Sequence, residues 1–159
     1  MDTDSSQIGN SPPASPYHSK KIPTWIISVL VIGAIYCLDG IVFGMFAGLS
    51  KSPAMVFMWR LAAWVTCSVL FAGNIWYEYY RFKNAPVKTA LHVSLASALG
   101  AFGLAVAANI HAQFVQTANQ IMLTLSLIIW PLLTMIPAFI VASAITLLLQ
   151  YFHKKAVPK

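Results

Sequence analysis

The sequence predicts an all-α integral membrane protein, a four-helix bundle with short loops, and three features indicate it. Of the 159 residues, 58% are hydrophobic and 9% are charged, whereas a soluble domain carries about 25% charged residues. Four apolar stretches each reach the roughly 20 residues that a helix needs to cross about 30 Å of hydrocarbon. Their connections are too short to hold an extramembrane domain, so we expect a single membrane domain over residues 22–153.

The chain begins with residues 1–21, which are rich in Ser, Pro and Asp and poor in apolar side chains. This composition is typical of disorder, and we expect a disordered cytoplasmic tail. The apolar stretch that follows is longer than the roughly 7–15 residues of a signal-peptide core. It is therefore expected to stay in the protein as the first span, from about residue 24 to residue 49.

The second, third and fourth spans are expected at about residues 54–80, 87–110 and 121–152. In lipid they must be helical, because every backbone polar group has to find its partner within the segment. Pro131 and Pro137 fall inside the fourth span, and they predict a kinked or strongly tilted helix. A basic cytoplasmic tail, residues 154–159, ends the chain.

Lysine and arginine residues are concentrated in alternate connections of the predicted bundle. Those on one side are Lys20, Lys21, Arg81, Lys83, Lys88, Lys154, Lys155 and Lys159. On the other side the first loop has only Lys51, and the third loop, residues 111–120, has neither type. Because cytoplasmic loops carry the excess of positive charge, both termini are expected in the cytoplasm. The small size and simple charge pattern favour a bacterial inner membrane, and membrane topology explains the basic residues better than a nucleic-acid partner does.

One aspartate, Asp39, lies in the middle of the first span, within the apolar run from Ile35 to Gly48. It is about ten residues from the outer end of that span, so about 15 Å deep. Arg60 is about 9 Å deep in the antiparallel second span. Because an unpaired charge at the bilayer centre costs roughly 2.5–3.5 kcal/mol, we expect an Asp39–Arg60 ion pair. The alternative is that Arg60 extends to the surface and Asp39 holds a proton.

Polar residues of the second span recur at helical spacing. The residues separated by four and three positions in turn are Arg60, Trp64, Cys67, Phe71, Asn74, Glu78 and Arg81. They share one stripe of the helix, which we expect to face the bundle interior because polar side chains avoid lipid. Glu78 is close to the predicted headgroup region, so we expect it to be an ordinary solvated charge at the interface. The alternative is a contact of Glu78 with His92 or Arg81, because Glu78 and His92 lie at similar distances from the middle loop.

Glycines recur in the first span as a GxxxGxxxG run, and two more lie in the third span. The predicted helix-packing residues are Gly33, Gly40, Gly44, Gly48, Gly100 and Gly103. Small residues at such spacing let helix backbones approach closely, so we expect the third span to be central. The partner of the glycine run is expected to be another span of the same chain, with a second copy as the alternative.

The sequence lacks the motifs of several enzyme classes. It contains no HExxH, no GxSxG, no P-loop and no glycine-rich dinucleotide turn. Cys37 and Cys67 lack metal-ligand spacing, and they are expected to be small buried apolar residues. His92 and His111 are about 28 Å apart along one helix, too far to ligate one haem iron. We therefore expect no catalytic residue, no metal site and no cofactor.

Three functions are compatible with these features. The first expectation is a non-enzymatic accessory, scaffold or partner-binding subunit, which lies in the lipid bilayer and binds a membrane protein or a second copy of itself. The alternative is a small oligomeric transporter or channel in which Asp39 is the proton or cation site. The residues along its route would be Arg60, Asn74, Glu78 and His92. The third is an intramembrane enzyme or haem protein, and in the enzyme Glu78 and His92 would be the acid–base pair.

Overall fold

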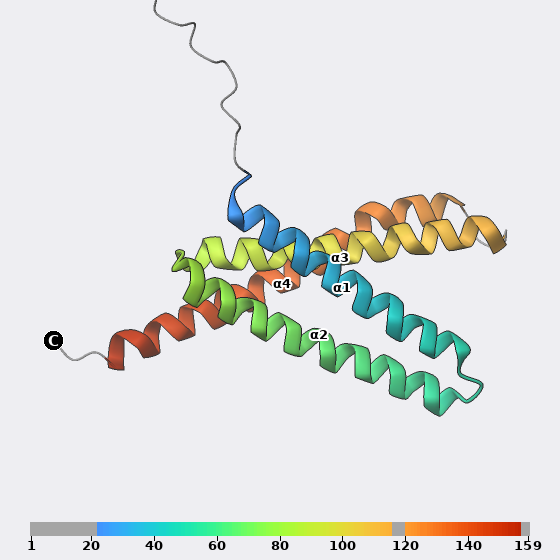
Figure 1. Ribbon diagram of the computed structural model, residues 1–159, viewed down its shortest axis with the longest axis horizontal. Coiled ribbons are helices and arrows are strands. Elements are labelled where there is room, and N and C mark those ends of the chain that lie inside the picture. Colours follow the sequence, from blue (N-terminus) through green and yellow to red (C-terminus); the bar gives the residue numbers. More distant parts are fainter. Residues whose placement is uncertain (1–21, 116–119, 157–159) are drawn as a thin grey trace, which may run out of the picture.

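The chain folds into four long helices, shown in Figure 1. The computed structural model describes residues 22–115 and 120–156. The helices are α1 (Thr24–Leu49), α2 (Pro53–Phe82), α3 (Pro86–Val115) and α4 (Gln120–Ala156). All four are long and apolar enough to cross a membrane. The prediction of an all-α, multi-pass membrane protein with four spans is confirmed, whereas the predicted disordered tail, residues 1–21, lies outside the described residues.

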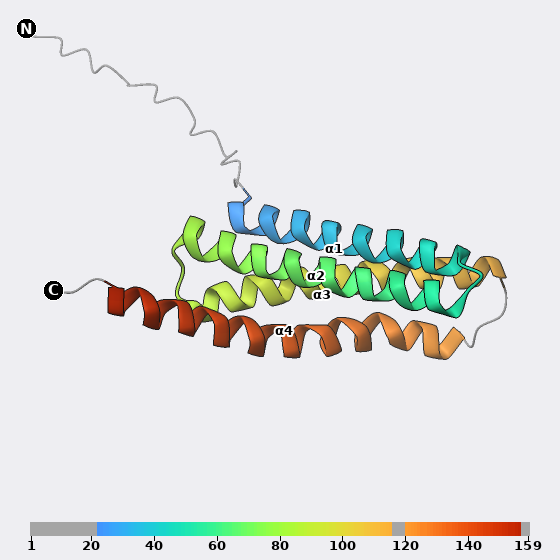
Figure 2. The same ribbon diagram turned by 90° about the horizontal axis from the view of Figure 1, so that it is seen from below.

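Successive helices run in opposite directions, as Figure 2 shows. One end of the bundle, here named the basic end, contains the start of α1, the α2–α3 connection and the last turn of α4. That last turn includes Lys154 and Lys155, so the helix continues into the predicted basic tail. The opposite end, named the turn end, contains the short connection between α1 and α2, residues 50–52.

Helix α3 is the central element, because it packs against each of the other three helices. Its buried residues are small or short: Thr89, Ala90, Val93, Ser94, Ala96, Ser97, Ala98, Gly100 and Ala105. Short side chains let neighbouring backbones come close. The apolar core lies toward the basic end, where Ile75, Ala90, Val93 and Ala142 are joined by Phe71, Phe139 and Leu149.

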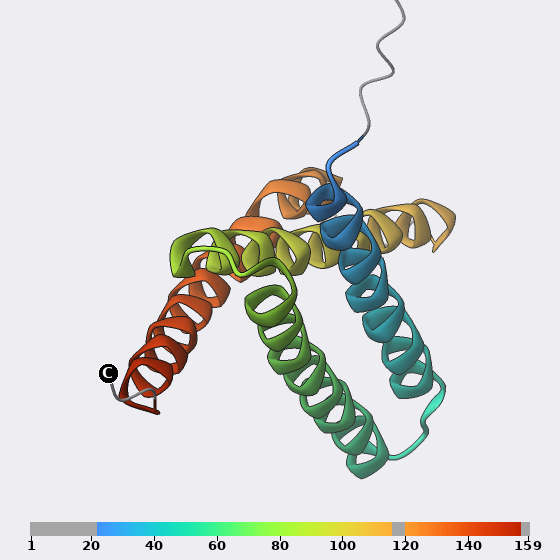
Figure 3. The same ribbon diagram turned by 60° about the vertical axis from the view of Figure 1, so that its left-hand side comes forward.

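The helices spread apart toward the turn end. Figures 1 and 3 show the far end of the α1–α2 hairpin pointing away from the far ends of α3 and α4. The three buried residues of α2 are accordingly Asn74, Ile75 and Glu78, all in its second half. Trp64 is 76% exposed, so the polar stripe of α2 faces the interior only near the basic end. Spacing along a helix could not reveal this divergence.

The glycines also differ between the closely packed part of the bundle and its turn end. A Cβ atom added at Gly33 or Gly40 would collide with the side chains of leucines on α3. A Cβ atom added at Gly100 would lie 2.5 Å from the Cβ of Tyr36 on α1. At Gly100 the obstacles are a Cβ atom and a backbone oxygen of α1, so only glycine fits, whereas at Gly40 the obstacle is the flexible end of the Leu104 side chain. Gly44 and Gly48 instead have nothing within 4 Å, and they face open space at the turn end.

Pro131 and Pro137 both lie inside α4, whose helix runs without a break from Gln120 to Ala156. Neither proline ends the helix. Proline has no backbone N–H to donate, so each removes one hydrogen bond of α4, but regular helical turns continue on both sides of it. The kink stays a prediction.

Candidate functional site

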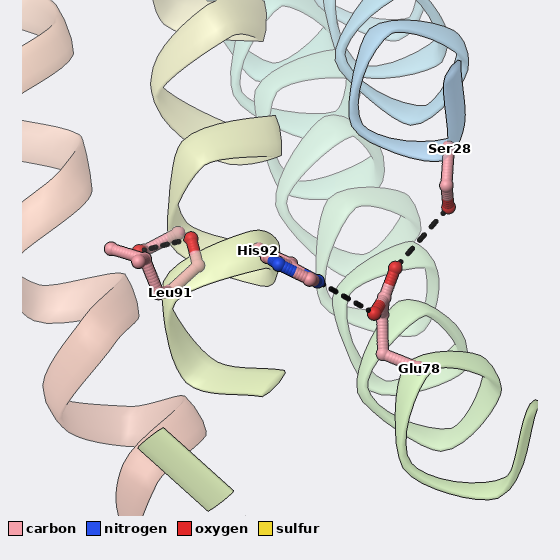
Figure 4. A network of polar contacts seen from close by, with 5 residues as sticks. Ser28, Glu78, Leu91 and His92 are labelled. Atoms are coloured by element: carbon pink, nitrogen blue, oxygen red, sulfur yellow. Dashed lines mark hydrogen bonds and ion pairs between the residues drawn. The ribbon is translucent and has the colours of Figure 1, made fainter. Parts of the chain in front are cut away.

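The most buried charged side chain belongs to Glu78, which is 1% exposed. It lies four residues before the end of α2, about 6 Å along the axis from Phe82. Its Oε1 accepts a hydrogen bond from the Ser28 hydroxyl at 3.3 Å, and its Oε2 lies 3.1 Å from Nδ1 of His92. Figure 4 shows these contacts, which join α2 to α1 and to α3.

The imidazole of His92 is held in place from α1. The ring of Trp25 stacks on it with centroids 4.8 Å apart and planes 6° from parallel. Trp25 and Ser28 are three residues apart, so they lie on the same face of α1. Glu78 therefore has a partner for each carboxylate oxygen, as a buried carboxyl group requires. The result is a compact polar cluster, named here the Glu78 cluster, made of Trp25, Ser28, Glu78 and His92.

Several buried polar atoms of the four helices have no hydrogen-bond partner among the described residues. They are the Tyr36 hydroxyl, Nδ2 of Asn74, the Thr89 hydroxyl and the Ser143 hydroxyl. Asn74 is 4% exposed and lies one turn from Glu78 on the same face of α2. The Tyr36 hydroxyl lies close to Ser97 and Asn74. A polar interior thus continues from the Glu78 cluster toward the bundle centre.

The predicted ion pair between Asp39 and Arg60 does not form in the described part of the chain. Oδ2 of Asp39 accepts a hydrogen bond from the thiol of Cys67 at 3.0 Å. The antiparallel register brings Cys67 opposite Asp39, whereas Arg60 lies seven residues, about 10 Å, nearer the turn end. Cys67 is thus a polar partner rather than the purely apolar residue that its surroundings suggested.

Arg60 is exposed and lies at the junction of two grooves at the turn end. The first, of about 390 Å³, runs along the seam between α1 and α2. Its lining residues are Gly40, Phe43, Gly44, Ala47, Gly48, Val56, Arg60, Ala63 and Trp64. The second, of about 460 Å³, lies over the α1–α2 connection. Its lining residues are Ser50, Lys51, Ser52, Pro53, Val56, Phe57 and Arg60.

The expectation that Glu78 is a solvated interfacial charge is wrong, because its side chain is buried. The structure instead places Glu78 beside His92, which is the alternative that depth along antiparallel helices had offered. Arg81, the other partner considered, is exposed. Sequence reasoning missed Ser28 and Trp25. The helical pattern of the first span did not mark them, because Ser28 contacts α2 and Trp25 contacts α3.

No group of three or more metal-ligating side chains occurs within residues 22–115 and 120–156. Comparison of the chain with protein-family models, with curated proteins and with solved structures finds no match. The function therefore has to be argued from the geometry of the helices and their polar residues.

Proposed function

We propose that this chain is a non-enzymatic multi-pass membrane subunit that binds another membrane protein through α2. The observation that carries the proposal is the exposure of α2. No residue of its most apolar stretch is buried, and that stretch has the lowest mean hydropathy of the four spans. Polar spans normally turn their polar side chains toward protein and not toward lipid. The other three helices leave this part of α2 exposed, so another protein would have to pack against it.

The exposed face of α2 also has the shape that a partner helix needs. Gly73 has nothing within 4 Å, and its neighbours Ala72 and Val69 are exposed. Small residues on a membrane helix allow close backbone approach, and van der Waals packing then drives association. This face lies away from the seam with α1, so a partner can reach it without disturbing the hairpin.

The Glu78 cluster suits a structural role within such a subunit. Its carboxylate oxygens are occupied by Ser28 and His92, and neither of the two grooves reaches it. The cluster fixes α1, α2 and α3 at the basic end, and α2 is thereby held in a defined position for its partner. We further propose that both termini are cytoplasmic, that α4 is kinked at its prolines, and that the membrane is a bacterial inner membrane.

A photo-crosslinking amino acid at Val69 tests the proposal in intact membranes. Val69 is 66% exposed on the proposed face, and Ile140 on α4 is 62% exposed, which makes Ile140 the matched control. We expect a discrete adduct with one membrane protein from position 69 and only diffuse lipid adducts from position 140. Equal patterns from the two positions would show that α2 has no dedicated partner.

Proton or cation transport is the second candidate, and a specific observation favours it. The unpartnered atoms of Tyr36 and Asn74 lie between the Glu78 cluster and Asp39, so polar groups line much of the interior. An intramembrane ionisable residue is a default candidate for ion movement. In proteoliposomes this function predicts a proton or cation flux that Asp39→Asn abolishes without loss of the fold. If the wild-type protein shows no flux, the transport function is ruled out and the subunit function is the one that remains.

A further inference from the structure

We propose that the turn end of the α1–α2 hairpin binds one anionic phospholipid. Its phosphate would lie between Lys51 and Arg60, and one acyl chain would lie along the groove between α1 and α2. This site goes beyond the proposed subunit function, because it uses the seam of the hairpin and not the exposed face around Gly73.

The two cations of the turn end share one groove. Lys51 and Arg60 both line the groove over the connection, together with the hydroxyl-bearing residues Ser50 and Ser52. The acidic residues in the described ranges are Asp39 and Glu78, and their contacts are with Cys67 and with the Glu78 cluster. No ion pair in those ranges involves Arg60 or Lys51. The groove is therefore a site of uncompensated positive charge.

A phosphodiester fits this charge better than a single carboxylate does. A guanidinium donates in parallel to two phosphate oxygens, and the Lys51 ammonium supplies a second charge beside it. Arg60 lies about 10 Å along α2 from Pro53, a depth from which a long side chain reaches the headgroup region. Its position beside residues of the connection agrees with such an outward path.

The adjoining groove accounts for the acyl chain. Arg60 and Val56 line both grooves, so the charged one continues into the apolar one. Gly44 and Gly48 form the floor of the apolar groove, because neither has a side chain to fill it. A Cβ atom added at either position would have no atom within 4 Å. From Gly40 to Gly48 this floor extends about 12 Å along α1, within one bilayer leaflet of about 15 Å. An acyl chain would fill the space along the seam between α1 and α2, and each methylene group would gain van der Waals contacts with the atoms that line the groove.

A partner helix is a poorer occupant of the same groove. The two helices of the hairpin remain in contact beside it, where Trp59 packs on Phe46 with ring centroids 4.8 Å apart and on Phe43 at 6.1 Å. The groove is thus a furrow between touching helices, whereas a helix with its side chains is about 10–12 Å across. A single hydrocarbon chain is far narrower and is present in every membrane.

Native mass spectrometry of the full chain tests the headgroup contact. The protein is released from micelles that contain equimolar phosphatidylglycerol and phosphatidylcholine, and the complex with one lipid is quantified. We expect retention of phosphatidylglycerol, with about tenfold weaker binding in the double variant Lys51→Gln/Arg60→Gln. The matched control is Arg81→Gln/Lys88→Gln, an exposed pair at the basic end, which should leave the retained lipid unchanged. An equal loss in both double variants would reduce the site to general electrostatic attraction.

Two glycines that are equally open test the acyl-chain contact. Gly44 lines the furrow and Gly73 does not, and neither has an atom within 4 Å of an added Cβ. Gly44→Leu should weaken binding of phosphatidylglycerol about tenfold by filling the furrow, while Gly73→Leu should not. Unchanged binding in Gly44→Leu would overturn the placement of the chain. Displacement of the lipid by an equal concentration of inorganic phosphate would also overturn the proposal, because the site would then bind the anion alone.

Discussion

The two halves of α2 carry similar residues and have opposite surroundings. Near the basic end, Asn74 and Glu78 are 4% and 1% exposed, and Glu78 has partners on two other helices. Toward the turn end, Arg60 is exposed and Trp64 is 76% exposed, although both belong to the same helical stripe. The difference arises from the divergence of the hairpin from α3 and α4. Residue type alone therefore does not decide which polar side chain of a span becomes interior.

The two ends of the bundle therefore differ in how their charged side chains are held. At the basic end Glu78 has partners on two neighbouring helices, and these contacts join α1, α2 and α3. At the turn end Arg60 is exposed and takes part in no ion pair within the described residues. Four sets of variants test this contrast, and the expected change in stability decreases from the first set to the last.

Loss of His92 should give the largest effect. His92→Leu leaves Oε2 of the buried Glu78 without its partner, and removal of one member of a buried pair destabilises by about 3–5 kcal/mol. The double variant Glu78→Leu/His92→Leu removes both polar groups, so its stability should return to within about 1 kcal/mol of the wild type. Reversible unfolding in mixed micelles measures both values.

The control for this pair is a polar substitution at the same site. His92→Gln keeps a hydrogen-bond donor within reach of Glu78 and should fall between the wild type and His92→Leu. If the double variant is as unstable as His92→Leu, then packing of the imidazole against Trp25 and not the polar contact stabilises the basic end.

The glycines give the second contrast. Gly100→Ala places a Cβ atom 2.5 Å from the Cβ of Tyr36 and 3.2 Å from the carbonyl oxygen of Gly33. The helices must move apart, which should destabilise the fold by about 1–3 kcal/mol. Gly44→Ala meets nothing within 4 Å and should be neutral or stabilise by up to about 1 kcal/mol, since alanine favours the helix. The same unfolding measurement in lipid-free micelles compares the two, and equal effects would contradict this contrast.

Much of this fold could be predicted from the sequence, because the strongest constraint on it is the membrane. Length and apolar composition suffice to define four helical spans, and the predicted first span, from about residue 24 to residue 49, matches α1 at both ends. Depth along antiparallel helices likewise predicted that Glu78 could reach His92. Both inferences depend only on the helical rise and on the order of the spans.

The rest depended on how the helices cross. The choice of Cys67 and not Arg60 as the partner of Asp39 follows from the rotation and register of α1 against α2, which spacing along one helix does not define. The exposure of Gly44 beside the closely packed Gly40 follows from the angle at which α1 leaves α3. Such angles are set by side-chain packing between helices, and they are properties of the whole bundle.

A double-mutant cycle sharpens the correction at Asp39. Asp39→Ala combined with Cys67→Ala should show a coupling of about 0.5–1.5 kcal/mol, the contribution of one hydrogen bond. Asp39→Ala combined with Arg60→Gln should show less than about 0.5 kcal/mol, because sites without a shared contact add independently. A larger coupling to Arg60 in a lipid bilayer would restore the ion pair that the sequence suggested.

The smallest effect concerns the two connections of α2. Lys83, at the basic end, adopts a left-handed conformation with φ 47° and ψ 34°, which is unfavourable for a residue with a Cβ atom. Lys83→Gly should therefore stabilise the fold by about 0.5–1 kcal/mol. At the turn end, Ser50 has an ordinary extended backbone with φ −79°, and its hydroxyl donates to the Phe46 carbonyl oxygen at 2.7 Å. Ser50→Gly is the matched control and should destabilise the fold slightly. If both glycine variants were more stable than the wild type, the left-handed backbone of Lys83 would not be the source of the strain.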